Sequence, residues 1–395
     1  FGETILNRMI HNREWVLFFI MPVCFVAAWW IVKKWAPYAR GSGIPQVMAA
    51  VELANPRDYN KVKKLLSLRI IFFKVVSSFI MVLGGGAIGR EGPTIQISGS
   101  VFKKLNEILP KWWPQISKKS MILTGAAAGL SAAFNTPLGG IVFAVEELTK
   151  IHFNNFKTAI FTAVIIAGLT SQQLAGSYLY LGFPKVAAVA PDVLFAVVVV
   201  AILSGLAASW LAKLILTIQR WRNSFTLQWQ HLLFLITSAL ILASVAYFIN
   251  TNVLGSGKEL MEDYLFTLRQ AHWYTPFLRM IGPALSFASG GAGGIFAPAL
   301  SGGASIGSVF AAWFHLSPTE GNVVILVGMV GFLTGITRAP FTSAILVLEM
   351  TDRHSLILHL MMAAVIANFA ASLISQHSFY DHLKHDYLRE LEKKL

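Results

Sequence analysis

The sequence predicts an all-α polytopic membrane protein in which two helical repeats meet, through broken and tilted helices, at an anion site near the membrane midplane. Three observations predict this architecture. Of the 395 residues, 55% are hydrophobic and 13% are charged, whereas a soluble domain has roughly 25% charged residues. Runs of about 20 mostly apolar residues, long enough to cross a bilayer as helices, recur along the chain. Glycine and proline motifs also recur, in the same order, in the two halves.

The apolar runs follow one another without the polar linker that would separate soluble domains. They cover residues 15–32, 65–83, 121–145, 156–175, 193–217, 231–250, 277–288, 322–348 and 355–374. Several are too short or too rich in glycine to be simple spans. We therefore expect one transmembrane domain with an N-terminal half over residues 1–192 and a C-terminal half over residues 193–395. The second half has two apolar runs before its Gly-Ser-Gly motif and the first has only one, so we expect a helix to be missing before Phe1.

Charge is unevenly placed along the chain. The 32 Lys and Arg residues exceed the 19 Asp and Glu residues, which gives a net charge of +13. They lie in short connectors, without the basic helix or aromatic-interleaved patch of a nucleic-acid binder, so we expect lipid headgroups and no nucleic acid as partners. The basic stretch 33–64 is predicted to be cytoplasmic, although the connector 103–119 is also basic. Cys24 is the only cysteine, which excludes an intrachain disulfide.

Three motifs of the first half recur in the second. Gly41-Ser-Gly43 matches Gly255-Ser-Gly257, Gly89-Arg-Glu-Gly-Pro93 matches Gly294-Ile-Phe-Ala-Pro298, and the segment from Gly125 to Pro137 matches the segment from Gly328 to Pro340. Pro137 and Pro340 are 203 positions apart, as are Glu146 and Glu349. Chance explains one match easily and three ordered matches poorly. Internal symmetry of this kind marks transporters with a substrate site at the interface of two repeats.

The Gly/Pro segments 41–45, 89–93 and 293–298 are predicted to break apolar runs and to start new helices. A helix that begins this way leaves backbone N–H groups uncovered, and these groups attract anions. Broken helices persist within a membrane only where they line a cavity or are buried in protein. The three breaks are therefore predicted to converge on one anion. The alternative is close helix packing through small residues, and we expect Gly125-x-x-x-Gly129 to be an instance of it.

Other kinds of site find little support. Gly84-x-Gly86-x-x-Gly89 matches the dinucleotide-binding fingerprint, with Glu107 at 18 positions beyond Gly89. That fingerprint requires a preceding strand, and the long apolar run 65–83 indicates a helix instead. No nucleophile has a paired base, and the ten histidines do not form a metal-ligand motif. We expect no cofactor, no metal and no enzymatic activity.

Four glutamates lie in or beside the apolar runs. A charge at the membrane centre costs about 2.5 to 3.5 kcal/mol on insertion scales, so such residues are candidates for function. Glu91 lies in a Gly/Pro break, where its carboxylate could occupy the N–H cradle until protonation releases it. Glu147 ends the run 121–145 and is a second candidate. We expect Glu146 and Glu349 to be solvated helix ends or to pair with basic neighbours.

With these motifs, the sequence resembles the CLC family of chloride channels and chloride/proton antiporters. The resemblance rests on Gly41-Ser-Gly-Ile-Pro45, Gly89-Arg-Glu-Gly-Pro93, Gly294-Ile-Phe-Ala-Pro298 and Tyr380, and it spans nearly the whole chain. It implies that the two helical repeats have inverted topology and that the protein is a homodimer with one anion pore in each subunit. It also implies that the hydroxyls of Ser42 and Tyr380 and the N–H groups of Ile295 and Phe296 hold a central chloride, and that N–H groups around Arg90, Glu91 and Gly92 form an outer site.

The same resemblance gives the glutamates their roles. Glu91 matches the gating glutamate that blocks the outer site until it is protonated or displaced, and Glu147 matches the internal proton-transfer glutamate of the exchangers. Ser42 favours chloride over nitrate or fluoride. Gln46 departs from the family, where Glu is common, and puts local ion pairing on the cytoplasmic side in doubt. Because only 15 residues follow Tyr380, we expect a prokaryotic inner-membrane protein without cytoplasmic regulatory domains.

The function expected from the sequence is therefore exchange of chloride against protons. A passive chloride channel of the same fold is the alternative. A cation or amino-acid carrier built on repeats is a more distant one, because it would aim carboxylates or carbonyls at its substrate, whereas the predicted breaks expose helix N-termini.

Overall fold

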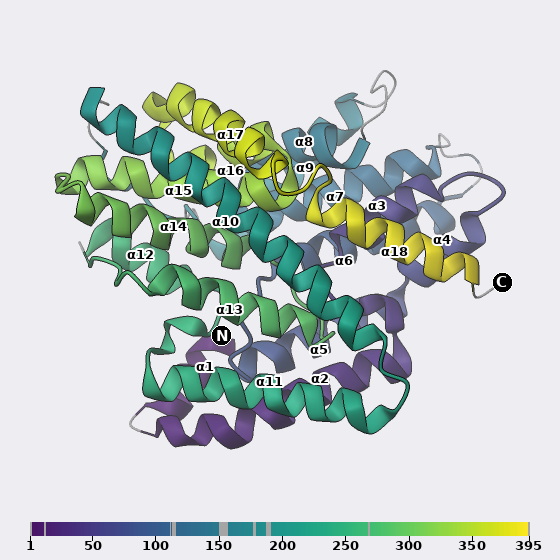
Figure 1. Cartoon of the computed structure of the whole chain (residues 1–395). Helices are drawn as coiled ribbons and strands as arrows, with labels where there is room; N and C mark the ends of the chain where they lie inside the picture. Colours follow the sequence, from purple (N-terminus) through teal and green to yellow (C-terminus); the bar gives the residue numbers. More distant parts are fainter. Residues whose placement is uncertain are drawn as a thin grey trace.

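The chain folds into a stack of helices (Figure 1), described here from a computed structural model. The structure describes residues 2–393 except 12, 111, 113–115, 150–156, 177–178, 187–190 and 268. The first half contains α1 (Gly2–Ile10), α2 (Leu17–Trp35), α3 (Ile44–Glu52), α4 (Tyr59–Leu65), α5 (Leu68–Leu83), α6 (Glu91–Ile108), α7 (Lys118–Phe134), α8 (Pro137–Phe143) and α9 (Lys157–Ala175). The second contains α10 (Pro191–Asn223), α11 (Gln228–Phe248), α12 (Lys258–Phe266), α13 (Thr275–Ala288), α14 (Phe296–Trp313), α15 (Pro318–Thr337), α16 (Pro340–Thr351), α17 (Ile357–Ser372) and α18 (Phe379–Lys393).

These helices confirm an all-α polytopic membrane protein. Among the described residues, six helical segments are long and apolar enough to cross a bilayer: Glu14–Trp35, Tyr59–Leu83, Val193–Asn223, Gln228–Phe248, Pro318–Thr337 and His354–Ser372. In the apolar 18-residue window of Pro318–Thr337, 89% of the window is buried inside the protein, whereas the buried share is 33 to 50% in the other five segments. Helix α15 is therefore a central helix covered by its neighbours, and α10 crosses the whole molecule beside it (Figure 1).

Two of the apolar runs are broken where the sequence suggested single stretches. The run 121–145 is divided between α7 and α8, and the run 322–348 is divided between α15 and α16. Each break has a residue in the left-handed region, Asn135 with φ 58° and Arg338 with φ 61°, and a proline at the first position of the next helix. A residue before proline avoids the helical conformation, and proline suits the first turn of a helix. The same interruption therefore occurs in both repeats.

Small residues bring the paired helices of each repeat into contact. A Cβ added to Gly125 would lie 2.7 Å from Cβ of Phe102, and one added to Gly129 would lie 2.8 Å from Cβ of Ser98. The prediction that Gly125 and Gly129 serve close helix packing, here of α7 against α6, is confirmed. In the second half, α14 and α15 approach in the same way, and a Cβ on Gly307 would lie 2.6 Å from Cα of Ile325.

Candidate functional site

The three Gly/Pro breaks meet at the centre of the molecule. Gly41 donates its N–H to the carbonyl of Gly291 at 2.8 Å, and Gly293 donates to the carbonyl of Gly41 at 3.0 Å. Gly89 and Gly294 exchange two hydrogen bonds of 2.7 Å each. These four bonds tie together the amino ends of α3, α6 and α14, so the predicted convergence of the breaks occurs.

Glycine is required at two positions of this junction. Gly43 has a φ of 112°, and a Cβ there would lie 2.5 Å from the carbonyl oxygen of Gly92. A Cβ on Gly92 would lie 2.7 Å from the carbonyl oxygen of Ser42 and would collide with its hydroxyl. Only a residue without a side chain allows the start of α6 to approach the loop before α3 this closely. The motif glycines therefore bring N–H groups of two helices to one place.

Two hydroxyls face this junction from opposite ends of the sequence. Ser42 precedes α3, and Tyr380 lies in the first turn of α18. Both are buried, their side chains are neighbours, and neither hydroxyl oxygen has a hydrogen bond of ordinary geometry among the described residues. A buried hydroxyl left without a partner costs free energy. The pair is therefore suited to donate to an anion.

The amino end of α14 lies against the same hydroxyls. Ile295 is the residue before the helix, Phe296 begins it, and both are buried. The ring of Phe296 stacks on Tyr380 with centroids 6.2 Å apart and planes at 15°. This stack positions the phenol beside the first turn of α14. The structure thus brings together Ser42, Ile295, Phe296 and Tyr380, the set that the family resemblance implies.

Glu91 is the first residue of α6 and is 1% exposed. Its carboxylate interacts with the backbone N–H groups of Glu91 and Ala297, while one of its oxygens has no hydrogen-bond partner among the described residues. Arg90 precedes the helix with an exposed side chain, and Gly92 follows Glu91 within it. The carboxylate thus lies between the amino ends of α6 and α14, where an anion would also be stabilised.

Glu147 lies in a π-helical turn, Ala144–Thr149, that continues α8. Its side chain is 2% exposed, and the charges of both Glu147 and Glu91 reach the Tyr380 phenol. Single π-helical turns occur frequently at functional sites. The sequence indicated Glu147 but not this turn, because one extra residue in a helical turn leaves no mark in the composition.

Glu146 and Glu349 do not behave as predicted. The Glu146 carboxylate accepts the N–H groups of Phe341 at 3.1 Å and Thr342 at 2.6 Å, at the start of α16. Glu349, in α16, accepts the N–H groups of Leu138 at 3.0 Å and Gly139 at 2.6 Å, at the start of α8. Each glutamate therefore caps a helix of the other repeat. The expectation of solvated ends or basic partners was wrong, because an uncovered helix N-terminus supplies the same positive partner.

Two buried cations, which the sequence did not reveal, hold the two Gly-Ser-Gly loops. Lys74 Nζ donates to the carbonyls of Ala39 at 3.0 Å and Gly41 at 2.8 Å. The Arg279 guanidinium donates to Ser301 Oγ and to the carbonyls of residues 252, 254, 255 and 256, all at 2.9 to 3.2 Å. Both side chains are fully buried. They are 205 positions apart, as are Gly89 and Gly294, and this shared spacing is the signal that could have identified them.

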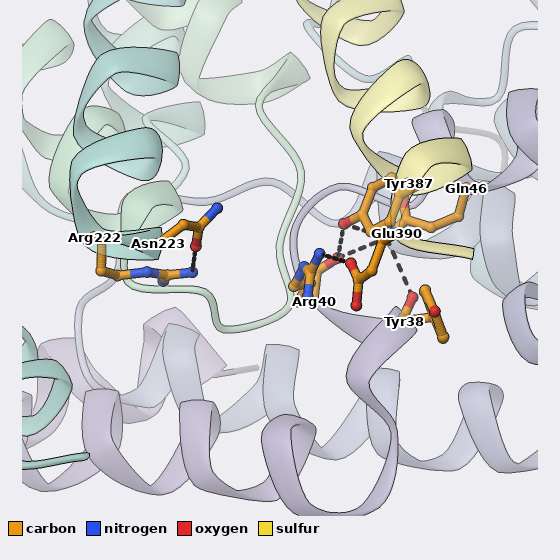
Figure 2. Close-up of polar contacts among 7 residues, drawn as sticks. All are labelled: Tyr38, Arg40, Gln46, Arg222, Asn223, Tyr387 and Glu390. Carbon is orange, nitrogen blue, oxygen red and sulfur yellow. Dashed lines mark hydrogen bonds and ion pairs between the residues drawn. The ribbon is translucent and has the colours of Figure 1, made fainter. Parts of the chain in front are cut away.

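Gln46 fixes the loop that carries Ser42 (Figure 2). Its amide nitrogen donates to the carbonyls of Tyr38 at 3.2 Å and Arg40 at 2.6 Å and to Tyr387 Oη at 3.1 Å, while its oxygen accepts the N–H of Gly43 at 3.1 Å. A glutamate carboxylate could accept the last bond but could donate none of the others. The ion pair here is Arg40 with Glu390 of α18, at 2.5 Å.

A membrane protein whose broken helices aim their amino ends at one buried centre belongs to the class of anion pores and carriers. A family model described as "Voltage gated chloride channel" matches residues 24–372. The chain belongs to this family.

Similar proteins agree with this assignment. The chain is 30% identical to the H(+)/Cl(-) exchange transporter ClcA of Cronobacter sakazakii over 93% of its own length and 79% of the relative's, and 29% identical to ClcA of Citrobacter koseri over 93% and 78%. Its fold matches a slow cyanobacterial Cl-/H+ antiporter with a TM-score of 0.83 and 24% identity, over 99% of this chain and 91% of that one. A CLC-type fluoride/proton antiporter matches with a TM-score of 0.80 and 21% identity, over 96% and 91%.

Proposed function

We propose that this protein exchanges chloride against protons across a membrane. The observation that carries the proposal is the position of Glu91: a buried carboxylate between the helix amino ends that would bind an anion. A group that competes with the anion when charged and releases the site when protonated couples the two ions. The relatives named as H(+)/Cl(-) exchange transporters favour exchange over a passive channel.

Each site residue has a role in this proposal. The hydroxyls of Ser42 and Tyr380 and the N–H groups of Ile295 and Phe296 hold the central chloride. N–H groups around Arg90, Glu91 and Gly92 form the outer site. Hydroxyl and amide donors present partial positive charge without a full cation, so chloride binds and still leaves.

Glu91 acts as gate and proton acceptor. When ionised, its carboxylate occupies the outer N–H cradle and keeps chloride out. Protonation removes its charge and weakens its hold on the N–H groups, so that chloride enters. Glu147, buried within electrostatic reach of Tyr380, transfers protons between Glu91 and the interior.

The same proposal covers the organisation of the protein. The repeats are the halves 1–192 and 193–395, and all but the first two residues of α10 belong to the second. Two copies pair through exposed apolar side chains of α9 and the first half of α17, such as Ile166 at 57%, Leu169 at 55% and Leu358 at 74% exposure. The homodimer lies in a prokaryotic inner membrane and uses neither a cofactor nor nucleic acid, and it is a transporter without enzymatic activity.

Simultaneous recording of chloride and proton flux in reconstituted liposomes tests the function. A chloride gradient is expected to drive protons uphill. Chloride flux without proton movement would establish the passive channel instead.

A pair of adjacent variants sharpens this test. Glu147→Gln is expected to keep chloride flux and to abolish proton coupling, because an amide cannot carry a proton. Glu146→Gln is the matched control, since it removes a carboxyl group from the neighbouring position, where it caps a helix, and coupling is expected to persist. Coupling that survives in Glu147→Gln would refute the role of Glu147.

A further inference from the structure

A cavity of about 210 Å³ lies between α10, the end of α17 and the start of α18. Lys213, Thr217 and Arg220 of α10 line one side, and Ser375, His377 and His382 line the other. The cavity lies on the side of the molecule that holds the basic stretch 33–64, because Arg222, two residues after Arg220 at the end of α10, lines a pocket together with Arg40 of that stretch. That side is the predicted cytoplasmic side.

Positive charge dominates the walls of the cavity. Lys213, Thr217 and Arg220 are exposed. They lie on one face of α10 because consecutive members of the set are four and three positions apart. Neither Lys213 nor Arg220 forms an ion pair with any described residue. Thus two cations of one helix face the cavity without a carboxylate to neutralise them.

The opposite wall contributes the imidazoles of His377 and His382 and, among the described residues, no carboxylate. Burial lowers the pKa of His382, and His377 and Arg220 lower it further, whereas Asp386 and Asp381 act in the other direction. Asp381 is engaged by Ser378, whose hydroxyl donates to it at 3.0 Å, and lies 4.0 Å from Lys384. Because the lowered pKa keeps His382 neutral, its imidazole offers one N–H donor to an anion and adds no positive charge.

Arg338 covers the groups that would repel an anion. Its guanidinium donates to the carbonyls of Asn368 at 2.9 Å and Ala371 at 2.5 Å and also to that of Ser375. These carbonyls belong to the carboxyl end of α17 and the segment after it, which carry partial negative charge. Arg338 compensates that charge, so the end of α17 no longer disfavours an anion in the cavity.

We propose that this cavity binds the phosphate group of an anionic phospholipid from the cytoplasmic leaflet. Its volume equals that of roughly seven water molecules, enough for a phosphate group and its hydrogen-bond donors. Trp210 and Leu373, adjacent to lining residues, are 61% and 71% exposed and offer an apolar surface to the acyl chains. Basic pockets between membrane helices on this side are suited to anionic headgroups. The site is separate from the proposed ion pathway and does not depend on the proposed exchange.

A bound lipid would brace the first turn of α18. Phe379 lines the cavity, and the next residue, Tyr380, carries the hydroxyl beside Ser42. The headgroup would join α10 to the start of α18 through Arg220 and His382. Occupancy is therefore expected to hold Tyr380 in place against Phe296.

Lipid binding to the purified full-length chain tests the proposal directly and without any transport measurement. Native mass spectrometry, with phosphatidylglycerol or phosphatidylcholine titrated into detergent micelles, gives the affinity for each lipid. The wild-type chain is expected to prefer phosphatidylglycerol. The double variant Lys213→Gln/Arg220→Gln is expected to lose about 30-fold in affinity for phosphatidylglycerol, as two cations near a lipid surface predict.

Matched variants distinguish binding at this cavity from a general effect of positive charge on the protein surface. Arg57→Gln/Lys64→Gln removes two exposed cations from the same side of the molecule and is expected to leave the affinity unchanged. Thr217→Glu adds a carboxylate to the cavity, keeps both cations and is expected to weaken binding as the double variant does, so the proposal stays testable if that variant does not fold. Unchanged phosphatidylglycerol affinity in both cavity variants would overturn the proposal. Equal affinity for phosphatidylcholine would overturn the preference for an anionic headgroup. Inorganic phosphate that binds as tightly as phosphatidylglycerol would overturn a lipid occupant.

Discussion

The two repeats share their backbone breaks but differ in the side chains placed at them. Glu91 begins α6, and Phe296, 205 positions later, begins α14. Both follow a glycine that is paired with its repeat mate, and both helices point their amino ends at the same centre. One repeat therefore places a titratable group where the other places an aromatic ring. In the proposed mechanism, the shared backbone supplies anion donors from both repeats, and the difference supplies a proton acceptor from one repeat only.

The glutamates near the ends of α8 and α16 show the same division. Glu146 and Glu349 are 203 positions apart, and each caps a helix of the other repeat. Glu147 has Met350 as its mate at the same spacing. Carboxylates present in both repeats thus hold the scaffold, whereas Glu91 and Glu147, each present in one repeat only, are the proposed proton carriers.

The largest effect is expected from removing the titratable group at the site of this difference. Glu91→Gln should abolish uphill proton movement driven by chloride, because an amide cannot accept the proton. Phe296→Leu, at the mate position, keeps its N–H group and should retain coupling. Flux recordings in liposomes measure both variants. Coupling in Glu91→Gln would show that Glu91, the residue by which the repeats differ at this position, is not the proton acceptor.

The buried cations test the shared part of the scaffold. Arg279→Met leaves the carbonyls of four residues without their donor and should lower the free energy of unfolding by at least about 3 kcal/mol, while Lys74→Met, which leaves two, should cost about 2 kcal/mol. Unfolding of the micelle-bound protein by SDS titration gives both values. Equal losses would mean that the number of bound carbonyls does not set the cost.

The reciprocal caps should respond alike. Glu146→Gln and Glu349→Gln each exchange a charged acceptor at a helix amino end for a neutral one, and each should lower the free energy of unfolding by about 1 to 2 kcal/mol. Proton coupling should persist in both. A loss of coupling confined to Glu146→Gln would place this residue with the proton carriers and break the division drawn above.

The smallest effect is expected at Gln46, which has Leu260 in the corresponding place after the second Gly-Ser-Gly motif. Gln46→Glu removes the donor to the carbonyls of Tyr38 and Arg40 and should weaken chloride binding about fivefold at neutral pH, the equivalent of roughly one hydrogen bond. Isothermal titration calorimetry measures this change. Protonation of the new carboxyl restores one donor, so affinity should partly recover as the pH falls. An unaltered chloride affinity would show that the hydrogen bonds of Gln46 do not influence the anion site.

The sequence predicted the site better than it predicted its supports. Glycine and proline within residues 89–93 and 293–298 predict helix starts from local sequence, because glycine frees the backbone and proline restricts it at their own positions. The caps formed by Glu146 and Glu349 could not be predicted in this way, since their N–H partners lie 195 and 211 positions away. The breaks at Asn135 and Arg338 were likewise hidden in continuous apolar runs.

By itself, the sequence determined the bilayer as solvent and the repeat, and it pointed to Glu91 as the proposed gate. Scarce charge and long apolar runs indicate a bilayer, ordered Gly/Pro motifs indicate two related halves, and a glutamate within such a motif is a candidate for function. Only the tertiary structure decided which contacts support the site. It paired the capping glutamates across the repeats and placed Lys74 and Arg279 against the two Gly-Ser-Gly loops. Such contacts depend on the path of the whole backbone, which no local pattern of residues contains.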